Sequence, residues 1–275
     1  MQTGQFSRTA IVTAAMRAAH QIEDGANILV DPLAGRALVE EDEEALRRAA
    51  DPAWRPLRLF VALRSRIAED VAREAVQNGA RQIVVLGAGF DTFSHRAPDV
   101  PGLKIFEVDH PATQREKRRR FALNRLDAPA RLTYAVCDFD AVPLADALAA
   151  AGFDPGARTA FLWLGVAPYL TAAAVEDTLR FIVARPGDVV FDYANPAHAI
   201  EDGGRKRFQE EMAARVARAG EPFRSHFDTP DLHRRLAEVG FDGVKDWGPR
   251  LIAERLGAPA NDSDAGGHIL HAWRR

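Results

Sequence analysis

The spacing of apolar positions divides the chain into two parts. Over the first 78 residues, which are rich in alanine, apolar positions recur every three or four residues, as expected of helices. This spacing predicts helices over residues 9–21, 31–50 and 56–77, the last of them stopped by Asn78 and Gly79. After residue 81 the pattern changes to short apolar runs rich in β-branched residues, which are typical of strands buried on both faces.

Seven runs of this second kind predict seven strands. They cover residues 82–86, 103–108, 132–136, 160–164, 188–193, 241–247 and 268–273. Predicted helices lie between most of them, at residues 111–124, 144–151, 172–183, 205–219 and 229–239. Strands that alternate with helices pair in parallel through right-handed crossovers. The pattern therefore predicts an α/β fold, with a doubly wound, seven-stranded Rossmann-like sheet in residues 79–275 and a helical N-terminal cap in residues 1–78.

Composition and charge favour a globular protein of the cytoplasm. Hydrophobic residues make up 47% of the chain and the formal net charge is −3, so no overall basic field attracts nucleic acid. The single cysteine, Cys137, cannot form a disulfide within the chain, which favours a reducing compartment. The polar N-terminus lacks a signal core, and the most apolar stretch, residues 159–175, is short for a membrane span. We therefore expect a cytoplasmic protein without a membrane partner.

A glycine loop follows the first predicted strand. Gly87 and Gly89 flank Ala88, and glycines at such a place allow a sharp turn and let backbone amides approach a ligand. Asp109 ends the second predicted strand and Asp138 follows the third. The first carboxylate can accept hydrogen bonds from ribose hydroxyls and the second from an adenine amino group, although turn glycines, a surface acid and a helix cap are the alternatives. Together these residues predict a site for an adenosine-type nucleotide.

The glycine spacing distinguishes between two cofactors. In the dinucleotide fingerprint a third glycine would stand where this chain has Thr92. That glycine allows a helix to pack closely beside a pyrophosphate. S-adenosylmethionine has no pyrophosphate, so the absence of the third glycine favours S-adenosylmethionine over NAD.

Arg64 is the least expected charge in the N-terminal part. The helical spacing of Leu57, Phe60, Ile67 and Val71 forms an apolar stripe, and the same spacing places Arg64 on it. A buried arginine needs an anionic partner. The carboxylate of the methionine part of the cofactor is one candidate, and an internal ion pair or a side chain that reaches solvent is the alternative.

Two segments carry specific motifs. Residues 79–92 contain the run Val85-Leu86-Gly87-Ala88-Gly89-Phe90-Asp91, and residues 106–111 read Phe106-Glu107-Val108-Asp109-His110-Pro111. Both resemble the leucine carboxyl methyltransferase family, which includes bacterial polyketide carboxyl methyltransferases. The segments Ser7–Ala10, Arg17–His20 and Asp31–Ala34 also resemble the bacterial branch. The resemblance covers most of residues 7–195 and implies a methyltransferase that uses S-adenosyl-L-methionine.

The resemblance also implies roles for individual residues. Arg64 would bind the cofactor carboxylate, Gly87 the methionine or ribose part, Asp109 the ribose, and Asp138 with Phe139 the adenine. It further implies cofactor contacts by Ala88, Gly89, His110, Leu164 and Tyr169.

Leu164 departs from the family pattern. Many members have a glutamate at this place after the fourth strand, where it helps to bind the amino end of the cofactor. Backbone carbonyls near Gly87 and Leu164 are the candidate replacements, while Tyr169 keeps its place in the pattern.

The candidate residues for the methyl acceptor are less sharply marked. Arg17 and His20 share one face of the first helix, and Tyr193 ends the fifth strand, where ligands of such sheets bind. Arg224 and His226 lie in a later loop. We predict that all five contact substrate, and that His20 and Tyr193 are catalytic.

The acceptor group decides whether a base is needed. A carboxylate is already ionised at neutral pH and needs none, whereas a phenol or alcohol would need one, such as His20 or His226. The family resemblance favours O-methylation of a carboxylate on a small molecule, with a phenol or hydroxyl as the alternative.

Other classes fit the sequence less well. The basic run at residues 115–120 has no interleaved aromatic residues and is predicted to be a solvated helix face rather than a nucleic-acid site. The histidines lack metal-ligand spacing, and no G-x-S-x-G motif is present. An NAD-type dehydrogenase is disfavoured by the missing third glycine and by the lack of a clear Tyr-x-x-x-Lys. A non-catalytic binding module stays open as an alternative, and no pattern indicates an oligomeric state.

Overall fold

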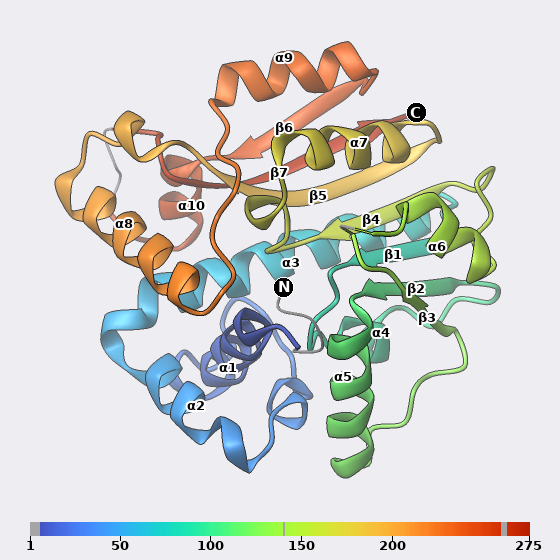
Figure 1. The fold of residues 1–275 in the computed structure, drawn as a ribbon, viewed down its shortest axis with the longest axis horizontal. Coiled ribbons are helices and arrows are strands. Elements are labelled where there is room, and N and C mark those ends of the chain that lie inside the picture. The colour runs from blue at the N-terminus through green and yellow to red at the C-terminus, as the bar shows by residue number, and fades with distance from the viewer. Residues whose placement is uncertain (1–5, 140, 260–262) are drawn as a thin grey trace.

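The computed structural model describes residues 6–139, 141–259 and 263–275, and its centre is a seven-stranded sheet (Figure 1). All seven predicted strands are present, with bounds that differ from the predicted ones by two residues or fewer. The strands are β1 (Gln82–Leu86), β2 (Lys104–Asp109), β3 (Leu132–Val136), β4 (Thr159–Trp163), β5 (Gly187–Ala194), β6 (Gly243–Trp247) and β7 (Gly267–Arg274). The order across the sheet is β3-β2-β1-β4-β5-β7-β6.

The strand order confirms the doubly wound sheet. From β1 the chain runs outwards to β2 and β3, and then returns to the other side of β1 with β4 and β5. This reversal opens a crevice at the carboxyl ends of β1 and β4, where ligands of such sheets bind. The expectation of parallel pairing is wrong for the last two strands, because β7 runs antiparallel to both β5 and β6.

Helices cover both faces of the sheet. Successive residues of β1 point to opposite faces, so Val84 packs into one core cluster and Val85 into the other. The first cluster includes residues of α6 (Leu144–Ala150), α7 (Ala172–Val183) and α9 (Thr229–Val239). The second includes residues of α3 (Arg55–Gln77), α4 (Phe93–Arg96) and α10 (Pro249–Arg255). Burial on both faces explains why the central strands are almost wholly apolar.

The N-terminal helices differ from the predicted cap. The segment predicted as one helix over residues 31–50 is wrong: the short 3-10 turns η1 (Ala34–Ala37) and η2 (Glu40–Asp42) come first, and only α2 (Glu43–Ala50) is α-helical. Asp31 causes the break, because its buried carboxylate accepts a hydrogen bond from Thr92 Oγ1 at 2.7 Å and holds this segment against the loop after β1. The turn η3 (Pro52–Trp54) then leads into α3.

The helices of the predicted cap, residues 1–78, pack in two different ways. α1 (Arg8–Glu23) and α2 contribute to a third apolar cluster with Phe90 and Phe121. α3, in contrast, packs on β4 and β5 and belongs to the helical layer that covers one face of the sheet. The predicted boundary at residue 78 therefore separates α3 from the sheet that it covers.

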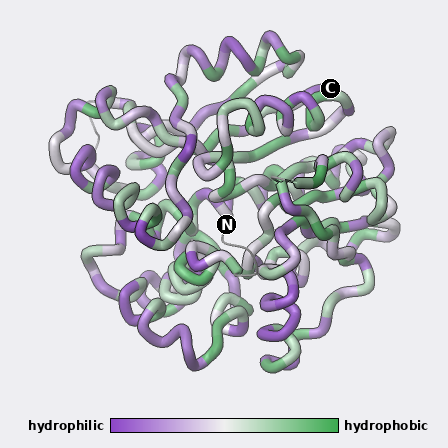
Figure 2. Tube along the Cα trace, in the orientation of Figure 1, coloured by the Kyte–Doolittle hydropathy of each residue, from purple (hydrophilic) through white to green (hydrophobic). Residues whose placement is uncertain are grey.

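The basic run lies on α5 (Pro111–Leu123), which is hydrophilic along most of its length (Figure 2). Its interpretation as a solvated face is wrong for two of its residues, because Lys117 and Arg120 are 1% and 2% exposed. Lys117 pairs with Glu107 of β2 and Arg120 with Asp42. Among the described helices, none is long and apolar enough to cross a membrane.

Candidate active site

A large cavity opens at the carboxyl ends of β1, β4 and β5. Its volume is about 1860 Å³, whereas a pocket for one small ligand usually has roughly 300–1,000 Å³. The loop after β1, the turn η4 (Ala167–Tyr169), and the helices α1, α3 and α8 (Gly203–Arg218) contribute to its wall. The cavity therefore has room for two ligands side by side.

The glycine loop forms a narrow part of this wall. Gly87 has a φ of +62°, and a Cβ added there would lie 2.3 Å from Val166 Cγ2. Gly89 has a φ of +46°, and its Cβ would lie 3.1 Å from Ala10 Cβ. Both the backbone angle and the lack of space require glycine at residue 87. The loop thus exposes bare backbone to the cavity.

Asp109 is fixed at the end of β2 by the glycine loop. Its Oδ2 accepts a hydrogen bond from Gly89 N at 2.6 Å and its Oδ1 one from His110 N at 2.7 Å. Burial nevertheless raises the pKa of this carboxyl to about 6, because water is largely excluded from it. The carboxylate lines the cavity and retains lone pairs for a further donor.

The predicted adenine residues lie beside Asp109. Asp138 and Phe139, after β3, are half-buried and line the cavity together with His110. Asp138 Oδ2 lies 3.7 Å from His110 Nε2, and His110 Nδ1 accepts a hydrogen bond from Ala112 N at the start of α5. The structure therefore brings the ends of β2 and β3 together along one wall.

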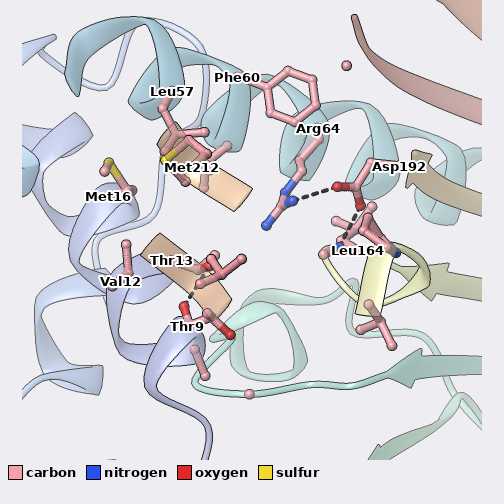
Figure 3. Close-up of a pocket in the computed structure, with 18 of the residues that line it drawn as sticks. Thr9, Val12, Thr13, Met16, Leu57, Phe60, Arg64, Leu164, Asp192 and Met212 are labelled. Carbon is pink, nitrogen blue, oxygen red and sulfur yellow. Dashed lines mark hydrogen bonds and ion pairs between the residues drawn. The ribbon is translucent and has the colours of Figure 1, made fainter. Parts of the chain in front are cut away.

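Arg64 lies on the buried face of α3, as its spacing predicts, and it forms an internal ion pair. Its Nη1 donates to Asp192 Oδ2 at 2.7 Å, and Gly165 N donates to Asp192 Oδ1 at 2.5 Å (Figure 3). The second terminal nitrogen of Arg64 points into the cavity (Figure 3). Asp192 was not among the predicted residues, although it has the same signal as Asp109: a carboxylate at the carboxyl end of a buried strand.

Leu164 and Tyr169 line the cavity next to this pair. Leu164 follows β4 and contributes only an apolar side chain (Figure 3). The ring of Tyr169 lies 5.2 Å from that of Phe223. Burial raises the pKa of the Tyr169 hydroxyl to about 12, so this group is a neutral donor at ordinary pH.

Tyr193, for which a catalytic role is predicted, borders the cavity near the end of β5, but its hydroxyl is bonded within the protein. Its hydroxyl donates to Asp246 Oδ2 at 2.6 Å and lies 2.9 Å from Thr229 Oγ1, while its ring stacks on His268. Burial raises the pKa of the hydroxyl far above its usual range. The hydroxyl is thus part of a network between β5, β6 and β7, and a catalytic role would require these bonds to break.

The predicted role of His20 is wrong. Its ring is fully buried, with Nδ1 at 3.2 Å from Asp24 Oδ2 and Nε2 accepting from Leu29 N at 3.3 Å. Burial lowers the pKa of the imidazole, and the ring does not line the cavity. Both ring nitrogens hold the segment after α1 instead.

Arg17 supports the glycine loop rather than a substrate. Its Nη2 donates to Phe90 O at 2.9 Å, and its Nη1 lies 3.5 Å from Asp91 Oδ2. It borders the cavity, but its guanidinium is buried against the loop. The substrate contact predicted for Arg17 is therefore replaced by a structural one.

The face of α1 that does meet the cavity was not predicted. It carries Thr9, Val12, Thr13 and Met16, with the spacing of one helix face (Figure 3). Opposite them lie apolar side chains from α3 and α8, namely Leu57, Phe60, Phe208 and Met212. The i, i+4 spacing of Phe208 and Met212 indicates an apolar face on α8, although most other residues of this helix are charged or polar.

Arg224 and His226, which are predicted to contact substrate, border the cavity. Arg224 N donates to Pro168 O at 2.7 Å, and Ser225 Oγ donates to Ala167 O at 3.0 Å. These bonds fix the segment to η4. Among the described residues, no group of three potential metal ligands comes together.

Known proteins match this chain in sequence and in fold. The family model for leucine carboxyl methyltransferase matches residues 10–183. YktD of Bacillus subtilis is 35% identical over 181 residues, covering 64% of this chain and 59% of that protein. A protein of Mycobacterium tuberculosis is 31% identical over 242 residues, covering 82% of this chain and 71% of its own length. Both have S-adenosyl-L-methionine-dependent methyltransferase in their names.

A solved structure shares the fold over almost its whole length. It is a DUF574 family protein from Streptomyces avermitilis, with a TM-score of 0.60, 16% identity and coverage of 98% of both chains. The chain spans 59% of the length of the Bacillus relative and matches the family model over most of its own sequence. It belongs to the leucine carboxyl methyltransferase family of S-adenosylmethionine-dependent methyltransferases.

Proposed function

We propose that the protein is an O-methyltransferase that methylates the carboxylate of a small, largely apolar molecule. The supporting observation is the part of the cavity between α1, α3 and α8. Its wall includes the apolar side chains Val12, Met16, Leu57, Phe60, Phe208 and Met212 beside the hydroxyls of Thr9 and Thr13 and the guanidinium of Arg64, while α8 adds the polar Arg205, Gln209 and Arg215. The nearby carboxylate of Glu221 accepts a hydrogen bond from Thr9 N, so it is held at the start of α1.

The other part of the cavity suits the cofactor. Gly87 lies in the cavity wall, where its bare backbone would contact the ribose and methionine parts of the cofactor. Asp109 would accept hydrogen bonds from the ribose hydroxyls, and Asp138 one from the adenine amino group. Phe139 would lie against the adenine ring.

The cofactor supplies an activated methyl group on a sulfonium. The protein's own task is to hold an acceptor oxygen in line with that methyl group and to exclude water. The apolar side chains of α3 and α8 would exclude water around the acceptor, and the hydroxyl of Thr9 would donate to its carboxylate, since the Thr13 hydroxyl already donates to Thr9 O at 3.0 Å. An ionised carboxylate needs no proton removed, so the transfer would require no base.

A phenol or hydroxyl acceptor is the second candidate, favoured by His226. Burial lowers the pKa of this imidazole, which lies on the wall next to Phe223, so it is neutral and able to accept a proton at pH 7. Replacing His226 by glutamine should reduce turnover of a phenol by roughly 10²–10⁴-fold but that of a carboxylate by less than about tenfold.

The direct test is methyl transfer from radiolabelled S-adenosylmethionine to a panel of apolar carboxylic acids and matched phenols. We expect label in a base-labile ester when an acid is the acceptor. Label only in base-stable ethers would contradict the proposal and support the phenol. No transfer together with no cofactor binding would favour a non-catalytic module.

Binding of adenosine ligands should weaken in acid. Only the ionised form of Asp109 can accept from both ribose hydroxyls, and its pKa of about 6 means that it becomes protonated as the pH falls below that value. Affinity for methylthioadenosine, which lacks the titratable amino-acid end, should therefore fall by up to about tenfold for each pH unit below 6. Calorimetry from pH 8 to pH 5 measures this, and Asp109→Asn should abolish the slope. A flat profile in the unmodified protein would refute the assignment of Asp109 to the ribose.

Replacing Gly87 by alanine should weaken S-adenosylhomocysteine binding by roughly tenfold, because the loop must move away from Val166. Gly102→Ala is the matched control, since Gly102 also has a positive φ, of +75°, but has open space around its missing Cβ. Both variants should lose about 1–2 kcal/mol of unfolding free energy through backbone strain. Only the change at Gly87 should alter the dissociation constant, and equal affinities would show that the loop does not touch the ligand.

A further inference from the structure

The wall of the cavity carries two opposite charges in contact. Arg64 and Asp192 are 8% and 5% exposed, and both border the cavity. Burying two charges is costly, and such a pair is often no more stabilising than apolar residues of the same size. A buried pair in the wall of a ligand cavity therefore calls for a role beyond stability.

The protein leaves some hydrogen-bond donors and acceptors of this pair unused. Arg64 uses Nη1 for Asp192, while its second terminal nitrogen points into the cavity (Figure 3). The buried Nε of Arg64 has no hydrogen-bond partner among the described residues. Asp192 has one bond to each carboxylate oxygen, from Arg64 and from Gly165, and each oxygen can accept another.

The pair also lies close to the glycine loop, with Gly165 and Val166 between them. The missing Cβ of Gly87 would touch Val166, and the missing Cβ of the preceding Gly165 would lie 2.8 Å from Arg64 Nη2. Gly165 has a φ of +69°, so its backbone folds towards Arg64 and presents its amide to Asp192. A ligand that binds on the glycine loop can therefore extend past Val166 and Gly165 and contact the Arg64–Asp192 pair.

The charge pattern selects the kind of group that fits. A lone carboxylate beside Arg64 would be repelled by Asp192, and a lone ammonium beside Asp192 would be repelled by Arg64. A group with both charges places each next to its opposite and adds no net charge to a buried site. The free amino and carboxylate groups of an amino acid have this pattern.

We propose that Arg64 and Asp192 together bind the amino-acid end of the cofactor, with Asp192 accepting from its ammonium and Arg64 Nη2 donating to its carboxylate. This rests on the proposed function insofar as the cofactor is S-adenosylmethionine. It assigns Asp192 as a cofactor-binding residue and makes the carboxylate on β5, rather than a side chain at Leu164, the partner of the amino group.

The test compares three ligands by calorimetry: S-adenosylhomocysteine, its analogue without the amino group, and its analogue without the carboxylate. In the unmodified protein, loss of either group should weaken binding by roughly ten- to hundredfold. The Asp192→Asn variant should bind S-adenosylhomocysteine more weakly by a similar factor. It should bind the analogue without the amino group almost as tightly as the unmodified protein does. The two changes are then not additive, as expected of groups in contact.

Asp188→Asn is the matched control. Asp188 is a buried carboxylate on the same strand, paired with Arg158 and His271 and outside the cavity. This variant should keep the full preference for ligands with an amino group.

The proposal is overturned if the unmodified protein binds the analogue without the amino group as tightly as S-adenosylhomocysteine, a result that needs no variant to fold. It is equally overturned if Asp192→Asn lowers the affinity for S-adenosylhomocysteine and for the analogue without the amino group by the same factor. Either result leaves the proposed methyl transfer intact, whereas failure of S-adenosylhomocysteine to bind at all contradicts the proposed function.

Discussion

Replacing Lys117 by methionine should lower the free energy of unfolding by about 3–5 kcal/mol. Lys117 Nζ lies 2.6 Å from Glu107 Oε2, and both side chains are 1% exposed. Ser94 Oγ donates to the other oxygen of Glu107 at 2.5 Å. Methionine fills similar space but leaves the Glu107 carboxylate as a buried charge without a cation, and this uncompensated charge dominates the loss.

Urea denaturation of the two proteins measures the difference. Arg119→Met is the matched control in the same basic run, because Arg119 is about half exposed and pairs with Glu116 at the surface. This control should change the unfolding free energy by less than about 1 kcal/mol. Adding Glu107→Gln to the Lys117 variant should recover part of the loss. A loss below about 1 kcal/mol for Lys117→Met would contradict the burial of this pair.

Replacing Arg64 by methionine should have the second large effect, on binding and stability together. The substitution removes the cation next to Asp192 and the donor that points into the cavity. We expect the affinity for S-adenosylhomocysteine to fall by more than about hundredfold and the unfolding free energy to fall by roughly 3 kcal/mol.

Arg66→Met provides the control on the same helix. Arg66 is about half exposed and pairs with Asp70 at the surface, so its removal should change neither quantity measurably. Arg64→Lys keeps the charge but not the fork of donors, and should bind with intermediate affinity. Unchanged affinity in Arg64→Met would remove Arg64 from the binding site.

The cofactor side of the site could be predicted from sequence because it depends on local order along the chain. Gly87, Asp109 and Asp138 each follow a strand, and the carboxyl ends of parallel strands meet at one edge of the sheet. Arg64 could be placed on a buried face because its helix has a regular apolar stripe. Its partner could not, since Asp192 lies far along the chain and the pairing depends on how α3 crosses the sheet.

The acceptor side could not be predicted, because it depends on how helices are rotated about their axes. Alanine occupies most of the buried positions of α1, so the sequence gives little indication of which face meets the cavity. Arg17 and His20 look like site residues for this reason, yet His20 is buried away from the cavity, the guanidinium of Arg17 is bonded to the glycine loop, and Thr9 and Thr13 line the wall. Tyr193 differs from them: its backbone is at the expected strand end, but its hydroxyl donates to Asp246 on β6, a contact that the sequence does not indicate.

The position of β7 has a consequence for the way the protein is made. It follows every other strand in the chain, yet it lies between β5 and β6 in the sheet. While the ribosome is still adding residues 195–266, β5 has an open hydrogen-bonding edge, and such edges recruit strands of other chains. Completion of the sheet therefore has to wait until residues 267–274 have been made, and a chain that stalls in this interval would be the form most in need of a chaperone.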